Sequence, residues 1–141
     1  MINQLSVFVE NKFGRLSAVM NSLSENNIDI SALSLADTSD FGILRLIVDK
    51  PDAAVACLRE QGVMVKCTPV IAAAMDDKPG GLSALLNILT KADISIEYMY
   101  AFIGKTKDSA WTVIRTDDNA AAEKAFKENG INMLSEQDIV K

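Results

Sequence analysis

Histidine is absent from this chain of 141 residues, and cysteine occurs only twice, as Cys57 and Cys67. Without histidine, no side chain has an ordinary pKa suited to proton transfer near neutral pH, and no Ser-His-Asp triad can form. The two cysteines lack partners at metal-ligand spacing, which favours structural roles over redox or metal chemistry. Neither a phosphate-binding P-loop nor a Gly-x-Ser-x-Gly elbow occurs. We therefore expect no catalytic residues, no metal and no cofactor, and we predict that the chain is not an enzyme.

Basic residues are also few, because 14 Lys and Arg stand against 19 Asp and Glu, a net charge of −5. They are scattered, whereas phosphate contacts need clustered Lys and Arg, so we expect no nucleic-acid partner. No apolar run approaches the roughly 20 residues that span a bilayer. The first residues also lack the basic segment and apolar core of a signal peptide. The expectation is a cytoplasmic protein with no membrane partner.

What the chain does contain is an internal repeat. Phe13–Val19 returns as Pro79–Leu85, and Leu58–Val63 returns as Phe126–Ile131. The offsets of the two pairs differ by two residues, which indicates a short insertion near Gly104–Ser109. A long period repeated once favours two copies of a small folded unit, residues 1–69 and 70–141. Because a unit of about 70 residues buries little surface, we expect the halves to pack together and the chain to form a homodimer.

Each half predicts the same order of elements. Alternating apolar residues predict a first strand around Leu5–Val9, and helical spacing predicts an amphipathic helix around Leu16–Leu23. The other strands are expected at Ile28–Leu35, Gly42–Val48, Val63–Cys67, Val70–Met75, Ile94–Ala101, Ala110–Arg115 and Ile131–Leu134. With a second helix in each half, the order is βαββαβ, twice. The predicted fold class is α+β: two ferredoxin-like units, with antiparallel sheets and helices on one face.

The segment between first strand and first helix is the strongest candidate for chemistry. In the second half it contains Pro79, which fits the first turn of a helix, followed by Gly80 and Gly81. Glycines let the backbone approach a guest closely, and the free N–H groups of a helix start suit a carboxylate. A plain strand-to-helix turn explains the same residues, and both interpretations stay open.

Two βαββαβ units, each with a loop ending in Gly-x-Leu before an amphipathic helix, resemble tandem ACT domains. Asp77–Leu82 is close to the best-known signature of that family, and Asn11–Leu16 is a looser copy with Phe13 in place of proline. Asn27–Ile30 and Asp93–Ile96 are similar to the family's approach to its second strand. The resemblance covers essentially the whole chain.

The resemblance implies a stand-alone regulatory or sensor protein that binds a small ligand, most often an amino acid, at the interface between ACT-like units. Asn11 and Asp77 match ligand-contacting side chains of the loop, and loop backbone groups would hold the carboxylate. Asp29 and Ser95 match a position that reaches across from the facing unit. The implied ligand-binding residues are Asn11, Phe13, Gly14, Arg15, Leu16, Asp29, Asp77, Lys78, Pro79, Gly80, Gly81, Leu82 and Ser95.

The two loops differ at Arg15, which has Gly81 as its counterpart. Arg15 either pairs with a ligand carboxylate or is a solvated surface arginine, and unequal sites follow in the first case. The implied partners are a free amino acid or similar small carboxylate, a second copy of the chain and a regulated enzyme in trans. The main alternative is a ligand-free protein-protein interaction or dimerisation module. A small enzyme on the same scaffold is a further alternative that no set of residues supports.

Overall fold

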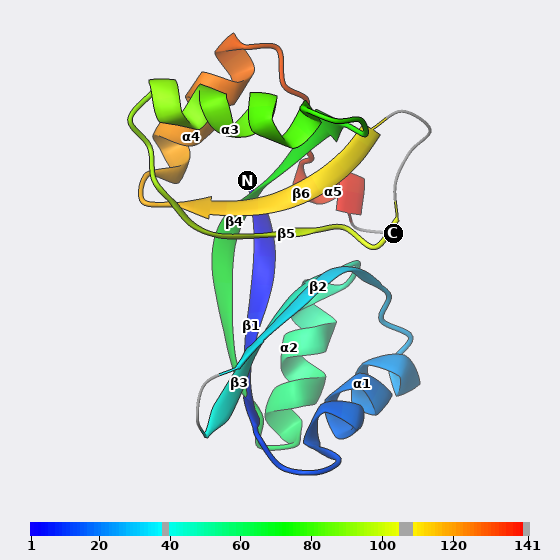
Figure 1. Ribbon diagram of the computed structural model, residues 1–141. Coiled ribbons are helices and arrows are strands. Elements are labelled where there is room, and N and C mark those ends of the chain that lie inside the picture. Colours follow the sequence, from blue (N-terminus) through cyan, green and yellow to red (C-terminus); the bar gives the residue numbers. More distant parts are fainter. Residues whose placement is uncertain (38–39, 105–108, 140–141) are drawn as a thin grey trace. The chain divides into compact units, whose positions relative to one another are not determined.

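Figure 1 shows the computed structural model, in which residues 1–37, 40–104 and 109–139 are described. The chain divides into two compact units. The first unit comprises Asn3–Thr68 with the chain from Gln137 onward, and the second unit comprises Met1–Ile2 with Pro69–Glu136. The predicted insertion near Gly104–Ser109 falls mainly on residues 105–108, outside the described residues. The predicted boundary between residues 69 and 70 lies within a strand and stays a prediction.

The first unit has two helices against antiparallel strands. Its elements are β1 (Ile2–Glu10), α1 (Arg15–Glu25), β2 (Ile30–Asp37), β3 (Phe41–Val48) and α2 (Pro51–Glu60), followed by the start of β4 (Met64–Asp76). β3 pairs with both β1 and β2, giving the order β2-β3-β1 with β4 next to β1. The core contains Leu5 of β1, Leu46 of β3 and Leu58 of α2, all fully buried. Alternate strand residues therefore meet the apolar stripes of both helices on one face.

The second unit repeats this arrangement. It continues β4 and adds α3 (Gly81–Lys91), β5 (Ile96–Ala101), β6 (Ser109–Thr116), α4 (Asn119–Glu128) and the short α5 (Glu136–Ile139). β6 pairs with both β4 and β5, in the order β4-β6-β5. Leu85 and Leu89 of α3, Phe126 of α4 and Ile114 of β6 are in its core. The predicted α+β class, with antiparallel strands and helices on one face, is confirmed.

The fourth strands differ from expectation. Val63–Cys67 and Val70–Met75 were expected as separate strands, but they form the single strand β4. Pro69 lies between them without breaking the strand, since proline fits an extended backbone where its missing N–H is not needed. The expected strand at Ile131–Leu134 is reduced to a bridge between Ala73 and Met133. This last strand is therefore shorter than the alternation of apolar residues predicts.

Candidate functional site

The loop before α1 opens directly onto a helix N-terminus. Gly14 is the N-cap with φ +80°, a left-handed conformation that favours glycine, and it offers no side chain to cap the helix. The Arg15 N–H donates to the Lys12 carbonyl at 3.2 Å, and the Ala18 N–H donates to the Gly14 carbonyl at 3.0 Å. Among the described residues, nothing accepts a hydrogen bond from the amides of Leu16 and Ser17. They can therefore bind an anionic group.

The loop before α3 has the same backbone geometry with less room. Gly80 is the N-cap with φ +89°, and the Gly81 N–H donates to the Lys78 carbonyl at 3.0 Å. A Cβ added at Gly81 would lie 2.0 Å from the carbonyl oxygen of Asp76, so only glycine fits there. In the first unit the equivalent position holds Arg15. The loops thus match in their hydrogen bonds and differ in the space beside the helix start.

Most side chains of the predicted loop residues lie at the surface. Phe13 is fully exposed, and the Asn11 N–H donates to the Asp40 carbonyl at 3.1 Å. Lys78 Nζ lies 3.8 Å from Asp76 Oδ2, and both side chains are about 70% exposed. The other predicted loop residues at the surface are Gly14, Arg15, Leu16, Asp77, Pro79, Gly80 and Leu82. These loop residues are therefore accessible to a ligand, whereas a ligand-binding role for each residue stays a prediction.

Asp29 and Ser95 occupy matching positions and are held in matching ways. The Asp29 N–H donates to Oδ1 of Asp49 at 2.9 Å, and the Asp49 N–H donates to the Asp29 carbonyl at 3.1 Å. Ser95 exchanges the same two hydrogen bonds with Asp117, both at 3.1 Å. These bonds use the backbone of Asp29 and Ser95, so each exposed side chain is held at a defined place before its strand.

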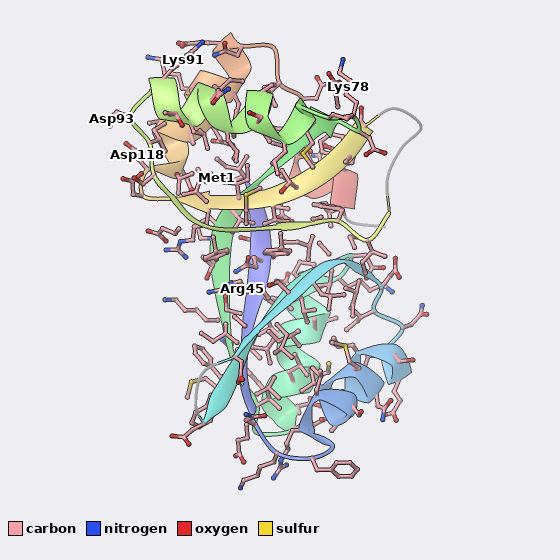
Figure 2. All side chains as sticks on the ribbon, in the orientation of Figure 1. Met1, Arg45, Lys78, Lys91, Asp93 and Asp118 are labelled. Carbon is pink, nitrogen blue, oxygen red and sulfur yellow. The ribbon has the colours of Figure 1, made fainter. Side chains whose placement is uncertain are left out.

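Within one unit, the loop and the start of the second strand lie at opposite ends. The first helix of each unit runs from the loop to the turn before the second strand. In the second unit, Lys78 lies at one end and Asp93, just before Ser95, lies at the other (Figure 2). One unit alone therefore cannot bring both sets of predicted residues to the same ligand.

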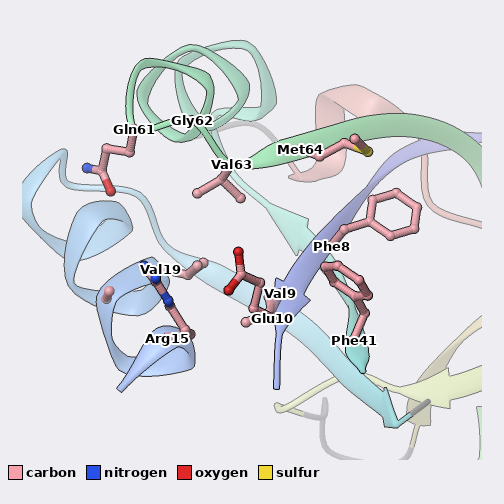
Figure 3. Close-up of a pocket in the computed structure, with 11 residues that line it drawn as sticks. Phe8, Val9, Glu10, Arg15, Val19, Phe41, Gln61, Gly62, Val63 and Met64 are labelled. Atoms are coloured by element: carbon pink, nitrogen blue, oxygen red, sulfur yellow. The ribbon is translucent and has the colours of Figure 1, made fainter. Parts of the chain in front are cut away.

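A pocket of about 540 Å³ lies within the first unit, where β1 and α2 end and α1, β3 and β4 begin. Its apolar lining comes from Phe8, Val9, Val19, Phe41, Val63 and Met64. Glu10, Arg15 and Gln61 add polar groups, and the Gln61 side chain accepts a hydrogen bond from Ser22 Oγ at 2.6 Å. Figure 3 shows Glu10 between Arg15 on α1 and the two aromatic rings of the strands. We call this the first-unit pocket; of the predicted residues, it contains Arg15.

Charges of both signs lie beside the apolar lining of the first-unit pocket. A hydrogen bond from Lys12, with Nζ to Oε2 at 3.1 Å, lowers the pKa of Glu10, and the positive charges of Lys12 and Arg15 lower it further. Glu10 therefore stays ionised. The guanidinium of Arg15, which acts on Glu10 through its charge, forms no hydrogen bond and no ion pair within 4.0 Å with any described residue. A guest can thus meet a carboxylate and an uncommitted guanidinium next to apolar walls.

The second unit has a pocket at the equivalent place, but it is smaller and more polar. Its volume is about 190 Å³. Repeat-equivalent lining residues change from Phe8 to Ala74, from Glu10 to Asp76, from Arg15 to Gly81, from Phe41 to Ser109 and from Met64 to Asn132. Sequence reasoning missed both pockets. A comparison of the two copies position by position could have found them, since the loss of two phenylalanines and a methionine is visible in the repeat.

Clusters of metal-binding side chains and membrane-spanning helices are both absent from the described parts of the chain. No group of three or more His, Cys, Asp or Glu side chains there is placed to hold a metal ion. None of the helices in these ranges is both long enough and apolar enough to cross a membrane.

Comparison with known proteins gives one consistent result. The family model for the ACT domain pair matches residues 1–141. Protein BT0572 from Bacteroides thetaiotaomicron is 37% identical, with a TM-score of 0.92 over 99% of this chain and 96% of that one. The ligand-free regulatory subunit of aspartate kinase from Thermus thermophilus is 15% identical, with a TM-score of 0.65 over 89% of this chain and 91% of that one. Among curated proteins, none matches the chain.

Proposed function

The chain belongs to the ACT domain pair family, and we propose that it is a stand-alone cytoplasmic regulator that binds a free amino acid or a similar small carboxylate. The observation that carries this proposal is the pair of uncapped helix starts at Gly14 and Gly80. Free amides there, together with the positive end of the helix dipole, favour a carboxylate. A regulatory role, rather than a catalytic one, follows from the family.

We place the ligand at the interface between two ACT-like units, from one chain or from two copies. The opposite positions of loop and second-strand start within a unit support this placement, because a facing unit must supply Asp29 or Ser95. A carboxylate such as that of Asp29 can accept hydrogen bonds from an α-ammonium group, which the Ser95 hydroxyl does less strongly. The first loop, faced by Asp29, would therefore bind an amino acid more tightly than the same loop faced by Ser95.

We also propose that the chain forms a homodimer. β2 is at the edge of the strand order, and Leu33 and Leu35 on it are 41% and 49% exposed. An edge strand with exposed apolar residues is a surface that a second copy can cover. The regulated partner is proposed to be an enzyme in trans, by analogy with the aspartate kinase regulatory subunit, whose likeness to this chain is one of fold.

Thermal denaturation in the presence of each of the twenty amino acids tests the function. A ligand at 100 times its Kd should stabilise the fold by about 2.7 kcal/mol. We expect Asn11→Ala or Asp77→Asn to reduce the ligand-induced rise in Tm, measured against the ligand-free Tm of the same variant. Lys124→Ala on the exposed side of α4, whose side chain is 78% exposed, is the matched control. No response to any amino acid would reject the sensor and favour the ligand-free interaction module.

A further inference from the structure

We propose that the first-unit pocket is a ligand site of its own, which binds an α-amino acid with a large apolar side chain such as phenylalanine or leucine. This goes beyond the proposed function, because every residue that lines the pocket belongs to the first unit and no second unit is needed. The volume of about 540 Å³ lies within the roughly 300–1,000 Å³ of small-molecule sites.

The charged groups of the pocket match the two ends of an amino acid. The guanidinium of Arg15 lines the pocket and forms no hydrogen bond with any described residue, so it can bind a carboxylate through two parallel hydrogen bonds. Glu10 is ionised and lies between Arg15 and the aromatic rings (Figure 3), where it can accept a hydrogen bond from an α-ammonium group. The partial engagement of Glu10 by Lys12 at 3.1 Å leaves its other oxygen for the ligand.

The apolar part of the lining sets the size and polarity of the ligand side chain. Phe8, Phe41 and Met64 come from three different strands and meet at one pocket (Figure 3). Met64 is 69% exposed and Phe41 is 48% exposed, so a guest that covers them removes apolar surface from water. A small or charged side chain, such as that of serine or aspartate, gains nothing from these walls.

The second unit supports the assignment by contrast. Its equivalent pocket holds Ala74, Ser109 and Asn132 where the first has Phe8, Phe41 and Met64, and Gly81 replaces Arg15. At about 190 Å³ it has neither the volume nor the cation for the same guest. We therefore expect one such site for each chain.

Isothermal titration of the full chain with L-phenylalanine and L-leucine tests the site. The double variant Phe41→Ser/Met64→Asn installs the residues of the second unit at two exposed positions, and Arg15→Gln removes the cation with little change in length. Each should weaken binding by about tenfold or more. Ile103→Ser, at an exposed apolar residue outside the pocket, is the control and should leave affinity unchanged. The ligand-free Tm of every variant is measured to show that the fold is retained.

A second ligand tests the role of Glu10. 3-Phenylpropionate keeps the carboxylate and ring of phenylalanine but lacks the ammonium group, so it should bind about tenfold more weakly. Equal binding would overturn the amino-acid assignment. If L-phenylalanine still binds to Phe41→Ser/Met64→Asn but no longer binds to Asp77→Asn, the pocket proposal is overturned and the interface site is retained. Loss with the pocket variant alone, and no response to small amino acids, would support the pocket while rejecting the interface site.

Discussion

Replacement of Gly81 by alanine should destabilise the second unit through a single contact. The added Cβ would lie 2.0 Å from the Asp76 carbonyl oxygen and 2.9 Å from its carbon. Both atoms belong to the backbone, so no flexible side chain can move aside. The Cβ and oxygen must separate by about 1 Å to reach even 3.0 Å, below which real Cβ contacts essentially never occur. Because Asp76 pairs with Ser109, the movement disturbs either the β4–β6 ladder or the start of α3.

The steric term should outweigh the favourable one. Overpacking of this kind costs about 1–3 kcal/mol. Alanine loses less backbone entropy than glycine on folding, which offsets roughly 0.4–1 kcal/mol. We expect a net loss of about 1–2 kcal/mol, which lowers Tm by roughly 4–16 °C for a unit of this size. Urea unfolding followed by the fluorescence of Trp111, the one tryptophan in the chain, reports on this unit because Trp111 lies opposite Ala74 in the ladder.

The equivalent change in the first unit supplies the control. Arg15 begins α1 as Gly81 begins α3, but it already carries a side chain without a clash. Arg15→Ala should therefore change the free energy of unfolding by less than about 0.5 kcal/mol. An unchanged or higher Tm for Gly81→Ala would refute the reasoning, because the loop backbone would then be able to relax at no cost.

Three further predictions concern single side chains. Iodoacetamide should modify the exposed Cys67 rapidly and Cys57 slowly, since burial raises the pKa of the Cys57 thiol. Mass spectrometry of tryptic peptides over time measures both rates, and equal rates would contradict this prediction. Leu35→Lys should shift the proposed dimer toward monomer in analytical ultracentrifugation, and an unchanged sedimentation coefficient would argue against pairing through β2. By carboxyl carbon NMR, Glu10 should titrate below its usual range, and Lys12→Ala should raise that pKa. Because folding lowers the pKa of Glu10, the ion pair stabilises the fold at pH values above the unfolded-state pKa, and this stabilisation is lost as pH falls through the folded-state pKa. In urea, where the chain is unfolded, the pKa of Glu10 should be the same with and without Lys12→Ala.

Local pattern was enough to predict the elements and their order, because each depends on residues close together in sequence. The helical spacing of Leu16–Leu23 could be interpreted without knowing which residues pack against it. The continuity of β4 could not, because whether Pro69 interrupts a strand depends on whether a partner needs its N–H. The fourth strand at Ile131–Leu134 was too long in the prediction for a related reason, since apolar alternation does not report how many backbone groups find partners.

The part of the candidate site that depends on local sequence was predictable, and the part formed by residues distant in sequence was not. The loops were predictable, because Gly14 and Gly80 have a conformational requirement that sequence motifs record. The first-unit pocket was not, because Phe8, Phe41 and Met64 come together only after three strands are placed in one sheet. Each looks like an ordinary strand residue on its own. What sets them apart is that all three are replaced in the second copy, by Ala74, Ser109 and Asn132.

The divergence of the two copies matters for regulation. The two loops keep the same left-handed glycine and the same backbone hydrogen bonds, so a ligand held only by loop amides would interact similarly with either unit. The pockets beside them differ in charge, polarity and volume, so a ligand with a large apolar body would distinguish the units. A ligand shifts an equilibrium only through its different affinity for the two states. On our proposals, a small carboxylate would therefore act on contacts between units and a large apolar amino acid on the first unit alone. Saturation with one should then leave a measurable binding heat for the other.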